Sequence, residues 1–369
     1  MPIEGNNNLH QMQPLVMGGA GFSYQLTPNP ESAPVAEILR NAFDSGVKTI
    51  DTSPYYEPSE QLLGAALQDP AIVNTYSRAD YFIMTKAGRI TATHLDYSPD
   101  WIRKSVKRSL ERFNTEYLDV VFIHDVELVS MQEALSAVQT LLELAQTGCI
   151  RNVGISGYDI GVLATIAELA PAMYGRPIDT VQAWAQMTLQ NNRLETHGLP
   201  RFRAAGVKMV FSSSPLATGL LRSEPVPVGR LGNWHPAPEG LRVQAQEAAK
   251  YVAAAGEDLA SLALRYAIRK AQSNTSTSML VSTICGVSTI EQLQRNVTDA
   301  KIALDCGDLA QARSHTMATT ISGTGSDELL CQRVKEILEP WQNFDFARQC
   351  VVQESQDSSD HATKTPARL

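Results

Sequence analysis

The sequence predicts an α/β fold of the (β/α)8 TIM-barrel type, because short apolar runs alternate with helical patterns from about residue 15 to residue 302. Several runs are continuously apolar, as expected for parallel strands that are buried on both faces. Eight strands, each followed by a helix, is the number that closes this barrel. The candidate strands span residues 15–19, 46–51, 81–86, 118–124, 151–156, 179–183, 207–212 and 279–284.

Helix-start signals lie between these runs. A stripe of apolar residues predicts an amphipathic helix over 99–113, with Ser98 as its N-cap and a proline at its first position. Ser130–Glu133 and Ser288–Glu291 have the pattern of capping boxes, which predicts two further helix starts. A last amphipathic helix is expected over 326–338.

Two segments interrupt the alternation. Residues 216–238 are rich in Gly and Pro and are expected to form a long loop over the barrel mouth, and residues 303–324 are expected to form a surface loop. With residues 89–97, these loops should decide which substrate is accepted. We expect one domain over residues 12–340 and a disordered tail over 353–369.

Composition narrows the function. The net charge of −8 argues against a nucleic-acid partner, and no apolar stretch reaches the ~18 residues of a membrane span. The first ten residues lack a secretory signal pattern, and the five cysteines are scattered, without metal-ligand spacing. We therefore expect a cytoplasmic protein with reduced thiols, no metal and no membrane partner. The oligomeric state stays open.

Four polar side chains follow the first candidate strands: Asp51, Tyr56, Lys86 and His124. Active sites of parallel barrels lie at the C-terminal ends of the strands, so these side chains should meet there. A free phenol titrates near ~10, and a neighbouring ammonium lowers its pKa. Such a set fits general acid–base catalysis at an alcohol or carbonyl oxygen. Taken singly, each residue also has a plain structural reading, as a cap, a packed ring or a solvated charge.

The chain resembles the aldo-keto reductase family over roughly residues 12 to 302. The similar motifs are Asp51–Tyr56, Ser59–Gly64, Thr85–Gly88, Leu118–Asp125, Gly154–Ser156, Val181–Gln182, Ser214–Leu216 and Gly286–Asn296. His124–Glu127 and Tyr97–Pro99 are most similar to the sugar 1-dehydrogenase branch, which holds the galactose and arabinose dehydrogenases, and the fungal arabinose type in particular.

The resemblance implies roles for residues of this sequence. Tyr56 would be the proton donor or acceptor, Lys86 and Asp51 would tune it, and His124 would orient the substrate oxygen. A nicotinamide cofactor would be held along the barrel mouth. Its carboxamide would contact Ser156 and Gln182, its pyrophosphate would pass Ser214 and Leu216, and its adenosine end would lie near Gly286, Ser288, Gln292 and Asn296.

Three positions depart from the family pattern. Gly157 stands where the family has Asn beside the carboxamide, and Ser213 stands where an aromatic residue stacks on the nicotinamide. Phe211 and Trp184 are then the candidate aromatics, and Trp184 is equally a candidate wall of the substrate pocket.

The third departure lies at the adenosine end. Gly286 and Gln292 replace the Lys and Arg that pair with the 2′-phosphate of NADP, and only Arg295 is close in sequence. We therefore expect NAD as the cofactor, with NADP possible.

Gly18-Gly19-Ala20-Gly21 invites comparison with a doubly wound dinucleotide-binding fold. The run lacks the full spacing of that fingerprint and the acidic residue about twenty positions later. A tight turn after the first barrel strand explains it better.

The sequence thus predicts an oxidoreductase that oxidises the anomeric C1 hydroxyl of a small-molecule sugar, of D-arabinose or L-galactose/L-fucose type, to the aldonolactone with NAD. A general NADPH-dependent carbonyl reductase of the same fold is the first alternative. A cofactor-binding regulatory subunit is the second.

Overall fold

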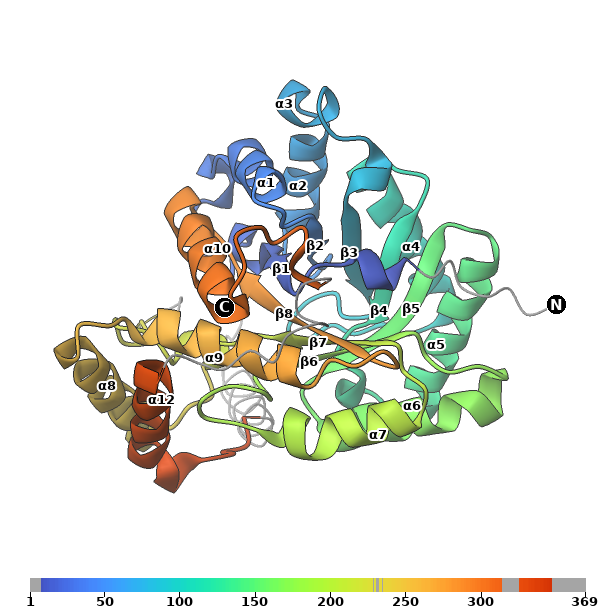
Figure 1. Cartoon of the computed structure of the whole chain (residues 1–369). Coiled ribbons are helices and arrows are strands. Elements are labelled where there is room, and N and C mark those ends of the chain that lie inside the picture. Colours follow the sequence, from blue (N-terminus) through green and yellow to red (C-terminus); the bar gives the residue numbers. More distant parts are fainter. Residues whose placement is uncertain (1–7, 228, 230–231, 234, 314–324, 347–369) are drawn as a thin grey trace, which may run out of the picture.

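The computed structural model describes residues 8–227, 229, 232–233, 235–313 and 325–346. Its eight parallel strands close a barrel in sequence order, and β8 pairs with β1, which confirms the predicted fold class (Figure 1). The strands are β1 (Leu15–Gly18), β2 (Thr49–Asp51), β3 (Phe82–Ala87), β4 (Leu118–Ile123), β5 (Ile150–Gly157), β6 (Thr180–Trp184), β7 (Met209–Ser213) and β8 (Leu280–Gly286).

Helices surround the barrel on its outer side (Figure 1). They are α1 (Val35–Asp44), α2 (Ser59–Leu67), α3 (Pro70–Val73), α4 (Pro99–Phe113), α5 (Met131–Gln146), α6 (Ile160–Tyr174), α7 (Leu199–Ala204), α8 (Glu239–Ala254), α9 (Leu259–Ser273), α10 (Ile290–Leu304) and α12 (Gly325–Ile337). The predicted start of α4 is confirmed, because the Ser98 side chain accepts a hydrogen bond from the N–H of Trp101. The capping box of α5 is present between Ser130 and Glu133.

The second strand is shorter than predicted. Residues 46–48 were expected to begin it, but Gly46 has a φ of +85° and its N–H donates to the carbonyl of Phe43. This left-handed position closes α1, so that extended pairing begins only at Thr49.

The barrel interior is filled by large side chains. Phe122 and Phe211 meet edge to face, with ring centroids 5.9 Å apart, among the buried side chains of Met84 and Met209. Phe211 is thus a residue of the barrel core and is not the aromatic partner of a nicotinamide. Leu9, in a short 3-10 helix ahead of β1, joins the same cluster.

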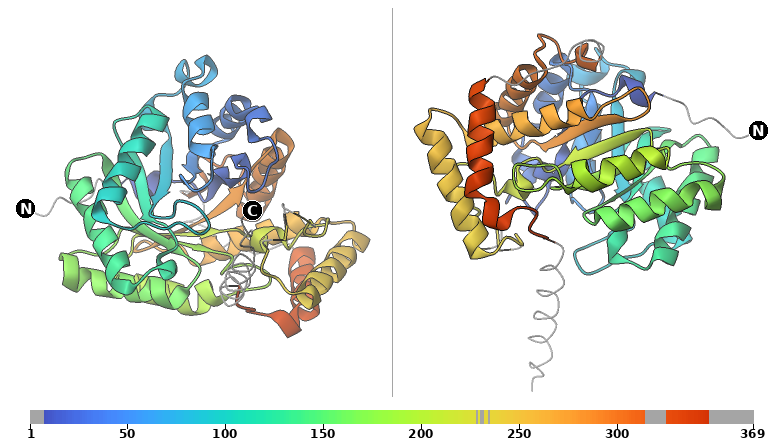
Figure 2. Two further views of the ribbon diagram at one scale, coloured as in Figure 1. Left: turned by 180° about the vertical axis from the view of Figure 1, so that it is seen from behind. Right: turned by 60° about the horizontal axis from the view of Figure 1, so that its bottom comes forward.

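Two helices lie outside the ring. α8 and α12 lie side by side next to α9 in all the ribbon views (Figures 1 and 2). Arg265 of α9 anchors α12, since its guanidinium bonds Asp327 at 2.8 Å and Asp299 of α10 at 3.0 Å. These buried ion pairs fix the helix that leads into the C-terminal residues 338–346.

One predicted loop lies at the wrong end of the barrel for substrate binding. Residues 306–313 follow α10, and the Arg313 guanidinium bonds the carbonyls of Met12 and Gln13, which precede β1. This segment therefore lies at the N-terminal end of the strands, away from the catalytic end. Residues 314–324 and the predicted tail 353–369 lie outside the described residues.

The glycine run after β1 forms a 3-10 turn over Gly19–Phe22, as the sequence predicted. A Cβ on Gly19 would lie 2.9 Å from the Ser59 hydroxyl, and one on Gly21 would lie 2.4 Å from the carbonyl oxygen of Val287. These two glycines are required by close packing of the protein against itself.

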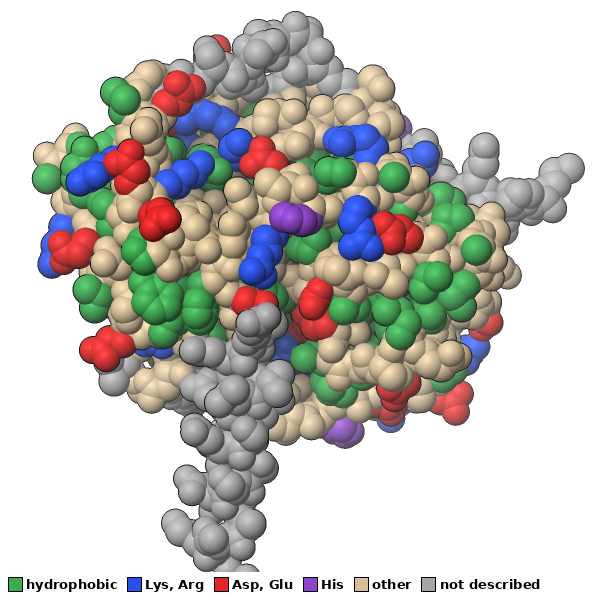
Figure 3. Space-filling view, turned by 90° about the horizontal axis from the view of Figure 1, so that it is seen from below, with side chains coloured by type: hydrophobic (Ala, Val, Ile, Leu, Met, Phe, Trp, Pro, Cys, Tyr) green, Lys and Arg blue, Asp and Glu red, His purple; other side chains and the backbone are tan. Residues whose placement is uncertain are grey.

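Among the described residues no helix is long and apolar enough to cross a membrane. On the face displayed in Figure 3, acidic and basic side chains are interspersed, and no basic stripe crosses it.

Candidate active site

Asp51, Lys86 and Gln182 meet at the C-terminal mouth of the barrel. The Lys86 ammonium donates to both carboxylate oxygens of Asp51, at 3.0 and 2.9 Å, and to the carbonyl of Thr52 at 2.9 Å. The Gln182 amide donates to Asp51 at 3.3 Å. Asp51 and Lys86 are buried, with exposed fractions of 4% and 2%. A buried pair with this many hydrogen bonds is held in one geometry.

Tyr56 and His124 lie against this ion pair. The Lys86 Nζ is 5.2 Å from the centroid of the Tyr56 ring, and the Tyr56 and His124 rings are 5.8 Å apart at 87°. Ser53 Oγ lies 3.1 Å from His124 Nδ1. The structure thus brings the four predicted side chains together, from the ends of β2, β3 and β4.

The acidity of Tyr56 differs from the prediction. Burial raises the pKa of the Tyr56 phenol well above its ordinary value, and the charges of Asp51 and Asp125 raise it further. The predicted lowering of this pKa by Lys86 is therefore wrong for this structure, because burial of the phenol and the charge of Asp51 raise it. The phenol is protonated at neutral pH, which is the form that can donate a hydrogen bond or a proton.

His124 is neutral at physiological pH. Burial lowers its pKa to about 3, and the positive charges of Lys86 and Arg89 act in the same direction against the opposing effect of Asp125. Its Nε2 lies 3.5 Å from Asp125 Oδ2, and Ser53 faces Nδ1. A neutral imidazole with its proton on Nε2 accepts the Ser53 hydroxyl at Nδ1 and keeps its single N–H for an acceptor at the mouth.

Sequence reasoning missed the groups that support His124. The Arg89 guanidinium bonds Asp125 at 2.6 Å and lies 4.2 Å above the Tyr55 ring. Burial opposes ionisation of Asp125, yet His124 and Arg89 hold its pKa below the usual value. The position of Asp125 directly after His124 was the available signal, since it follows a strand end.

Tyr97 fixes the end of β4. Its hydroxyl donates to the carbonyl of His124, and its ring covers Gly88, where an added Cβ would lie 2.6 Å from the ring. Gly88 also has a φ of +109°, so two constraints favour glycine there. The Thr85–Gly88 and Tyr97–Pro99 motifs are thus parts of one local structure.

The Ser59–Gly64 motif, which follows Tyr56, has a structural role. The buried Glu60 carboxylate accepts hydrogen bonds from Thr85 at 2.7 Å, Ser109 at 2.8 Å and Arg112 at 2.9 Å. These bonds join α2 to β3 and α4. They hold the loop that carries Tyr56 against the strand that carries Lys86.

Ser156 and Gln182, which were predicted to hold a nicotinamide carboxamide, lie side by side at the barrel mouth in the β5–β6 register. The Ser156 hydroxyl donates to the carbonyl of Ile123 at 3.3 Å. The Oε1 of Gln182 is buried and has no hydrogen-bond partner among the described residues. An orphaned buried acceptor beside the Asp51 carboxylate fits an incoming amide N–H, so these residues fit a nicotinamide group.

Position 157 has no room for the family's Asn. A Cβ on Gly157 would lie 2.1 Å from Glu127 Oε2. Glu127 Oε1 accepts the N–H of Tyr158 at 2.6 Å, which holds the carboxyl against the end of β5. The space where a side chain at position 157 would begin is thus occupied by Glu127, which lies in the turn after β4.

Trp184 belongs to an aromatic cluster at one side of the mouth. It ends β6 beside Ser213, and its ring lies 4.6 Å from that of Tyr158. Tyr158 also contacts Phe346, at 6.1 Å, and the N–H of Phe346 donates to the Tyr158 hydroxyl at 2.9 Å. The C-terminal residues therefore form part of this wall, which the sequence analysis did not predict.

The residues predicted to lie near the adenosine end of the cofactor differ from the prediction in one respect. Ser288 is not the N-cap of α10, because Thr289 accepts the N–H of Gln292 and the Gln292 side chain accepts the N–H of Ser288, at 2.9 Å. Asn296 donates to the carbonyl of Gly286 at 3.3 Å. Within 4 Å of a Cβ added to Gly286 there are no other atoms, so this position faces open space.

Ser214 and Leu216, the residues predicted to contact the pyrophosphate, follow the end of β7. Ser214 has a φ of +57° and is half-buried, and Leu216 packs against the cluster that contains α8. The loop that follows β7 is closed by a hydrogen bond between its two ends, because His235 Nε2 lies 2.7 Å from the Thr218 hydroxyl. Residues 228, 230–231 and 234 of this loop lie outside the described residues.

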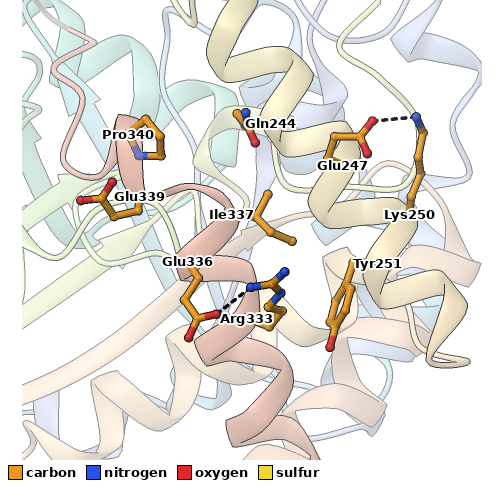
Figure 4. Close-up of a pocket in the computed structure, with 9 residues that line it drawn as sticks. All are labelled: Gln244, Glu247, Lys250, Tyr251, Arg333, Glu336, Ile337, Glu339 and Pro340. Carbon is orange, nitrogen blue, oxygen red and sulfur yellow. Dashed lines mark hydrogen bonds and ion pairs between the residues drawn. The ribbon is translucent and has the colours of Figure 1, made fainter.

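A separate groove lies between α8 and α12, with a cavity volume of about 700 Å³ (Figure 4). Its charges are paired locally, Glu247 with Lys250 and Arg333 with Glu336. It contains none of the residues predicted for catalysis. The residues that line it are Gln244, Glu247, Lys250, Tyr251, Arg333, Glu336, Ile337, Glu339 and Pro340.

A closed (β/α)8 barrel with a buried carboxylate–ammonium pair, a phenol and a neutral imidazole at its mouth has the groups that acid–base chemistry at an alcohol or carbonyl oxygen requires. Residues 14–316 match the model of the aldo/keto reductase family. The chain belongs to that family, and it is an NAD(P)-dependent oxidoreductase.

Three relatives of this chain are named as sugar dehydrogenases. The chain is 39% identical to D-arabinose 1-dehydrogenase of Saccharomyces cerevisiae over 314 residues, which covers 85% of this chain and 88% of the relative. It is 28% identical to L-galactose dehydrogenase of Arabidopsis thaliana, over 92% of this chain and 94% of the relative. It is 26% identical to D-threo-aldose 1-dehydrogenase of a Pseudomonas species, over 75% and 87% respectively.

Proposed function

We propose that this enzyme oxidises the anomeric C1 hydroxyl of an aldose, of D-arabinose or L-galactose/L-fucose type, to the aldonolactone, with NAD as its cofactor. The observation that carries the proposal is the assembly of Tyr56, Lys86, Asp51 and His124 in a chain 39% identical to a D-arabinose 1-dehydrogenase. The relatives' names supply the substrate class, and the site supplies the chemistry.

In this mechanism Tyr56 takes the proton of the C1 hydroxyl. A nicotinamide held by Ser156 and Gln182 would supply the acceptor for the hydride of C1, so that loss of this hydride and of the hydroxyl proton would turn the sugar into the lactone. His124 donates a hydrogen bond from Nε2 to the same oxygen and fixes its position. Lys86 stabilises negative charge on the phenol oxygen, and Asp51 holds the Lys86 ammonium in position.

Because the pKa of Tyr56 is raised, only a small fraction of the phenol is ionised at neutral pH. Oxidation of the sugar therefore speeds up as pH rises. In the reverse direction the protonated phenol is already the form that donates to a carbonyl oxygen.

Carbon-bound hydrogens of a sugar ring need an apolar surface, and the half-buried Trp184, backed by the buried Tyr158 ring, offers one. This wall is held by the C-terminal segment, since the N–H of Phe346 donates to the Tyr158 hydroxyl at 2.9 Å. We therefore propose that residues 12–340 and the few that follow act as one catalytic unit.

NAD is favoured over NADP because Gly286 and Gln292 carry no positive charge. The Gln292 side chain is engaged with the N–H of Ser288, and Arg295 is exposed on α10. A 2′-phosphate would carry negative charge without a lysine at 286 or an arginine at 292 to pair with it.

The test is a panel of initial rates, followed at the absorbance of the reduced nicotinamide, with D-arabinose, L-galactose and L-fucose and with NAD or NADP. We expect rapid reduction of NAD by one of these sugars and slow reduction of NADP. Turnover of simple aldehydes with NADPH, without oxidation of any sugar, would assign the chain to the general carbonyl reductases instead.

A further inference from the structure

The carboxylate of Asp125 lies between two hydrogen-bond donors at the barrel mouth. Its Oδ2 atom is 2.6 Å from the Arg89 guanidinium and 3.5 Å from Nε2 of His124. The first distance is that of a charge-assisted hydrogen bond, and the second is longer than an N–H···O bond. One carboxylate oxygen therefore faces both donors and is bonded to only one of them.

The hydrogen of the His124 imidazole lies on the nitrogen that faces Asp125. The Ser53 hydroxyl accepts the N–H of Tyr55 at 3.1 Å, so its own hydrogen is left for Nδ1 of His124, which also lies 3.1 Å away. Nδ1 is then an acceptor, and the neutral imidazole carries its proton on Nε2. This single N–H is the group that the mechanism gives to the substrate oxygen, and Asp125 Oδ2 is a competing acceptor.

The backbone on both sides of this contact is fixed. Asp125 has a φ of +46°, and its carbonyl accepts the Leu128 N–H at 3.0 Å. Arg89 pairs with Leu95 in a short β-bridge, and its guanidinium lies 4.2 Å from the centroid of the Tyr55 ring. The side chain of Asp125 can therefore turn while its backbone stays in place, and the guanidinium decides which donor the carboxylate meets.

Without Arg89 the carboxylate would bond the imidazole. Asp125 is buried, and a buried carboxylate without a hydrogen-bond donor is strongly destabilised. The Tyr97 hydroxyl is not available to it, because that hydroxyl donates to the carbonyl of His124. The Nε2 hydrogen of His124 is the donor already facing Oδ2, and a charged acceptor binds it more strongly than a neutral sugar hydroxyl does.

We propose that Arg89 is a positioning residue: its guanidinium holds Oδ2 of Asp125 and thereby leaves the Nε2 hydrogen of His124 for the substrate oxygen. Arg89 acts through Asp125 and need not touch the sugar. The inference rests on the proposed function, because it assigns this hydrogen to the oxygen at the reacting carbon.

Proton NMR of the coenzyme-free protein tests this geometry without turnover. In Arg89→Met an apolar chain still covers the Tyr55 ring, and the His124 N–H should bond Asp125 and give a downfield signal that exchanges slowly with water. The wild type should lack this signal, because its N–H faces the mouth and exchanges rapidly. Loss of the signal in Arg89→Met/His124→Gln assigns it to His124.

A second double variant removes the competing acceptor. Arg89→Met/Asp125→Gly has no carboxylate, and glycine adopts the φ of +46° without strain, so the downfield signal should be absent. Arg89→Gln keeps a neutral donor for the buried carboxylate and serves as a milder variant. Its signal and its loss of rate should both be smaller than those of Arg89→Met.

Initial rates measure the consequence for catalysis. Arg89→Met should lower kcat for sugar oxidation about 10- to 100-fold, the effect of one hydrogen bond to a charged group, and leave NAD binding unchanged. Arg89→Met/Asp125→Gly should recover most of this loss, whereas a merely structural role predicts a slower enzyme when two side chains are removed. Arg89 also lowers the pKa of the Tyr56 phenol, but that effect produces no His124 signal, so NMR separates the two routes.

Absence of the His124 signal from Arg89→Met, or a double variant Arg89→Met/Asp125→Gly no faster than Arg89→Met, would overturn the inference and leave the proposed function intact. A wild type that oxidises no aldose would overturn the proposed function, and the NMR comparison, which needs no substrate, would still decide whether Arg89 holds Asp125 away from His124.

Discussion

Lys86 donates to both carboxylate oxygens of Asp51 inside the barrel mouth, and both side chains are almost fully buried. Removing one partner of such a pair leaves an uncompensated charge in a region of low dielectric constant, whereas removing both leaves none. The pair is therefore expected to behave as a unit in stability and in catalysis.

The first prediction concerns this unit. Lys86→Met should lower the free energy of unfolding by about 3–5 kcal/mol, and the double variant Lys86→Met/Asp51→Leu should recover most of that loss. Both should be inactive in sugar oxidation. Chemical denaturation and initial rates measure the two properties separately.

An exposed ion pair provides the control. Arg103 and Glu143 are 2.6 Å apart and about half exposed, so Arg103→Ala should change stability by less than about 1 kcal/mol. A double variant as unstable as Lys86→Met alone would show that the loss does not come from the buried charge of Asp51.

The second prediction concerns the phenol. Tyr56→Phe should reduce kcat for sugar oxidation by about 10²–10⁴-fold, because the proton acceptor is removed while the ring remains. NAD binding should be unchanged. Tyr55→Phe is the matched control, since that ring stacks on Arg89 beside the same histidine.

The same pair of variants separates the pH effects. Wild-type oxidation should accelerate with rising pH, because the raised pKa of Tyr56 keeps the accepting form scarce at neutral pH. The residual rate of Tyr56→Phe should lack this rise, and Tyr55→Phe should retain it. A full rate in Tyr56→Phe would contradict the mechanism.

The third prediction concerns stability in acid. The pKa of His124 is about 3 in the folded protein and about 6.5 in an unfolded chain, so the unfolded state binds more protons between these values. Stability from neutral His124 is complete above about pH 6.5 and is lost as pH falls toward 3. At about pH 5 the loss should reach roughly 2 kcal/mol.

The measurement compares Tm at about pH 7.5 and about pH 5 for the wild type and His124→Gln, which does not titrate. The wild type should lose more stability on acidification than the variant. Other buried titrating groups, such as His235, are present in both proteins and cancel in the difference. Parallel losses in the two proteins would show that His124 is not buried in its neutral form.

The fourth prediction concerns cofactor choice. Gly286→Lys places a cation where the structure has open space, so kcat/KM with NADP should rise about tenfold, the effect of one charge-assisted hydrogen bond, with little change for NAD. Gly286→Gln is the control, because it adds a similar chain without charge. Equal gains in both variants would show that charge at this position does not select the cofactor.

The barrel and the meeting of Asp51, Tyr56, Lys86 and His124 could be predicted from sequence, because strand ends of a parallel barrel converge by geometry. The N-cap of α4 could also be predicted, because Ser98 and Trp101 are close in sequence. Ser288 was misassigned because Ser and Thr at adjacent positions both have N-cap chemistry, and tertiary context chose Thr289.

Other features depend on contacts between residues distant in sequence. The raised pKa of Tyr56 follows from burial beside Asp51 and Asp125, which a linear pattern does not report. Glu127 fills the space over Gly157 although it lies thirty positions earlier, which a linear pattern also does not report. The contact of Phe346 with Tyr158 is of the same kind.

The central claim is that the hydride leaves C1 of an aldose, and deuterium labelling tests it most directly. The enzyme is incubated with NAD and the preferred aldose carrying deuterium at C1, and the reduced coenzyme is examined by mass spectrometry. The mechanism predicts that the reduced coenzyme contains the deuterium, and that sugar labelled at C2 transfers none. Deuterium retained in the sugar product, or no coenzyme reduction with any aldose, would contradict the claim.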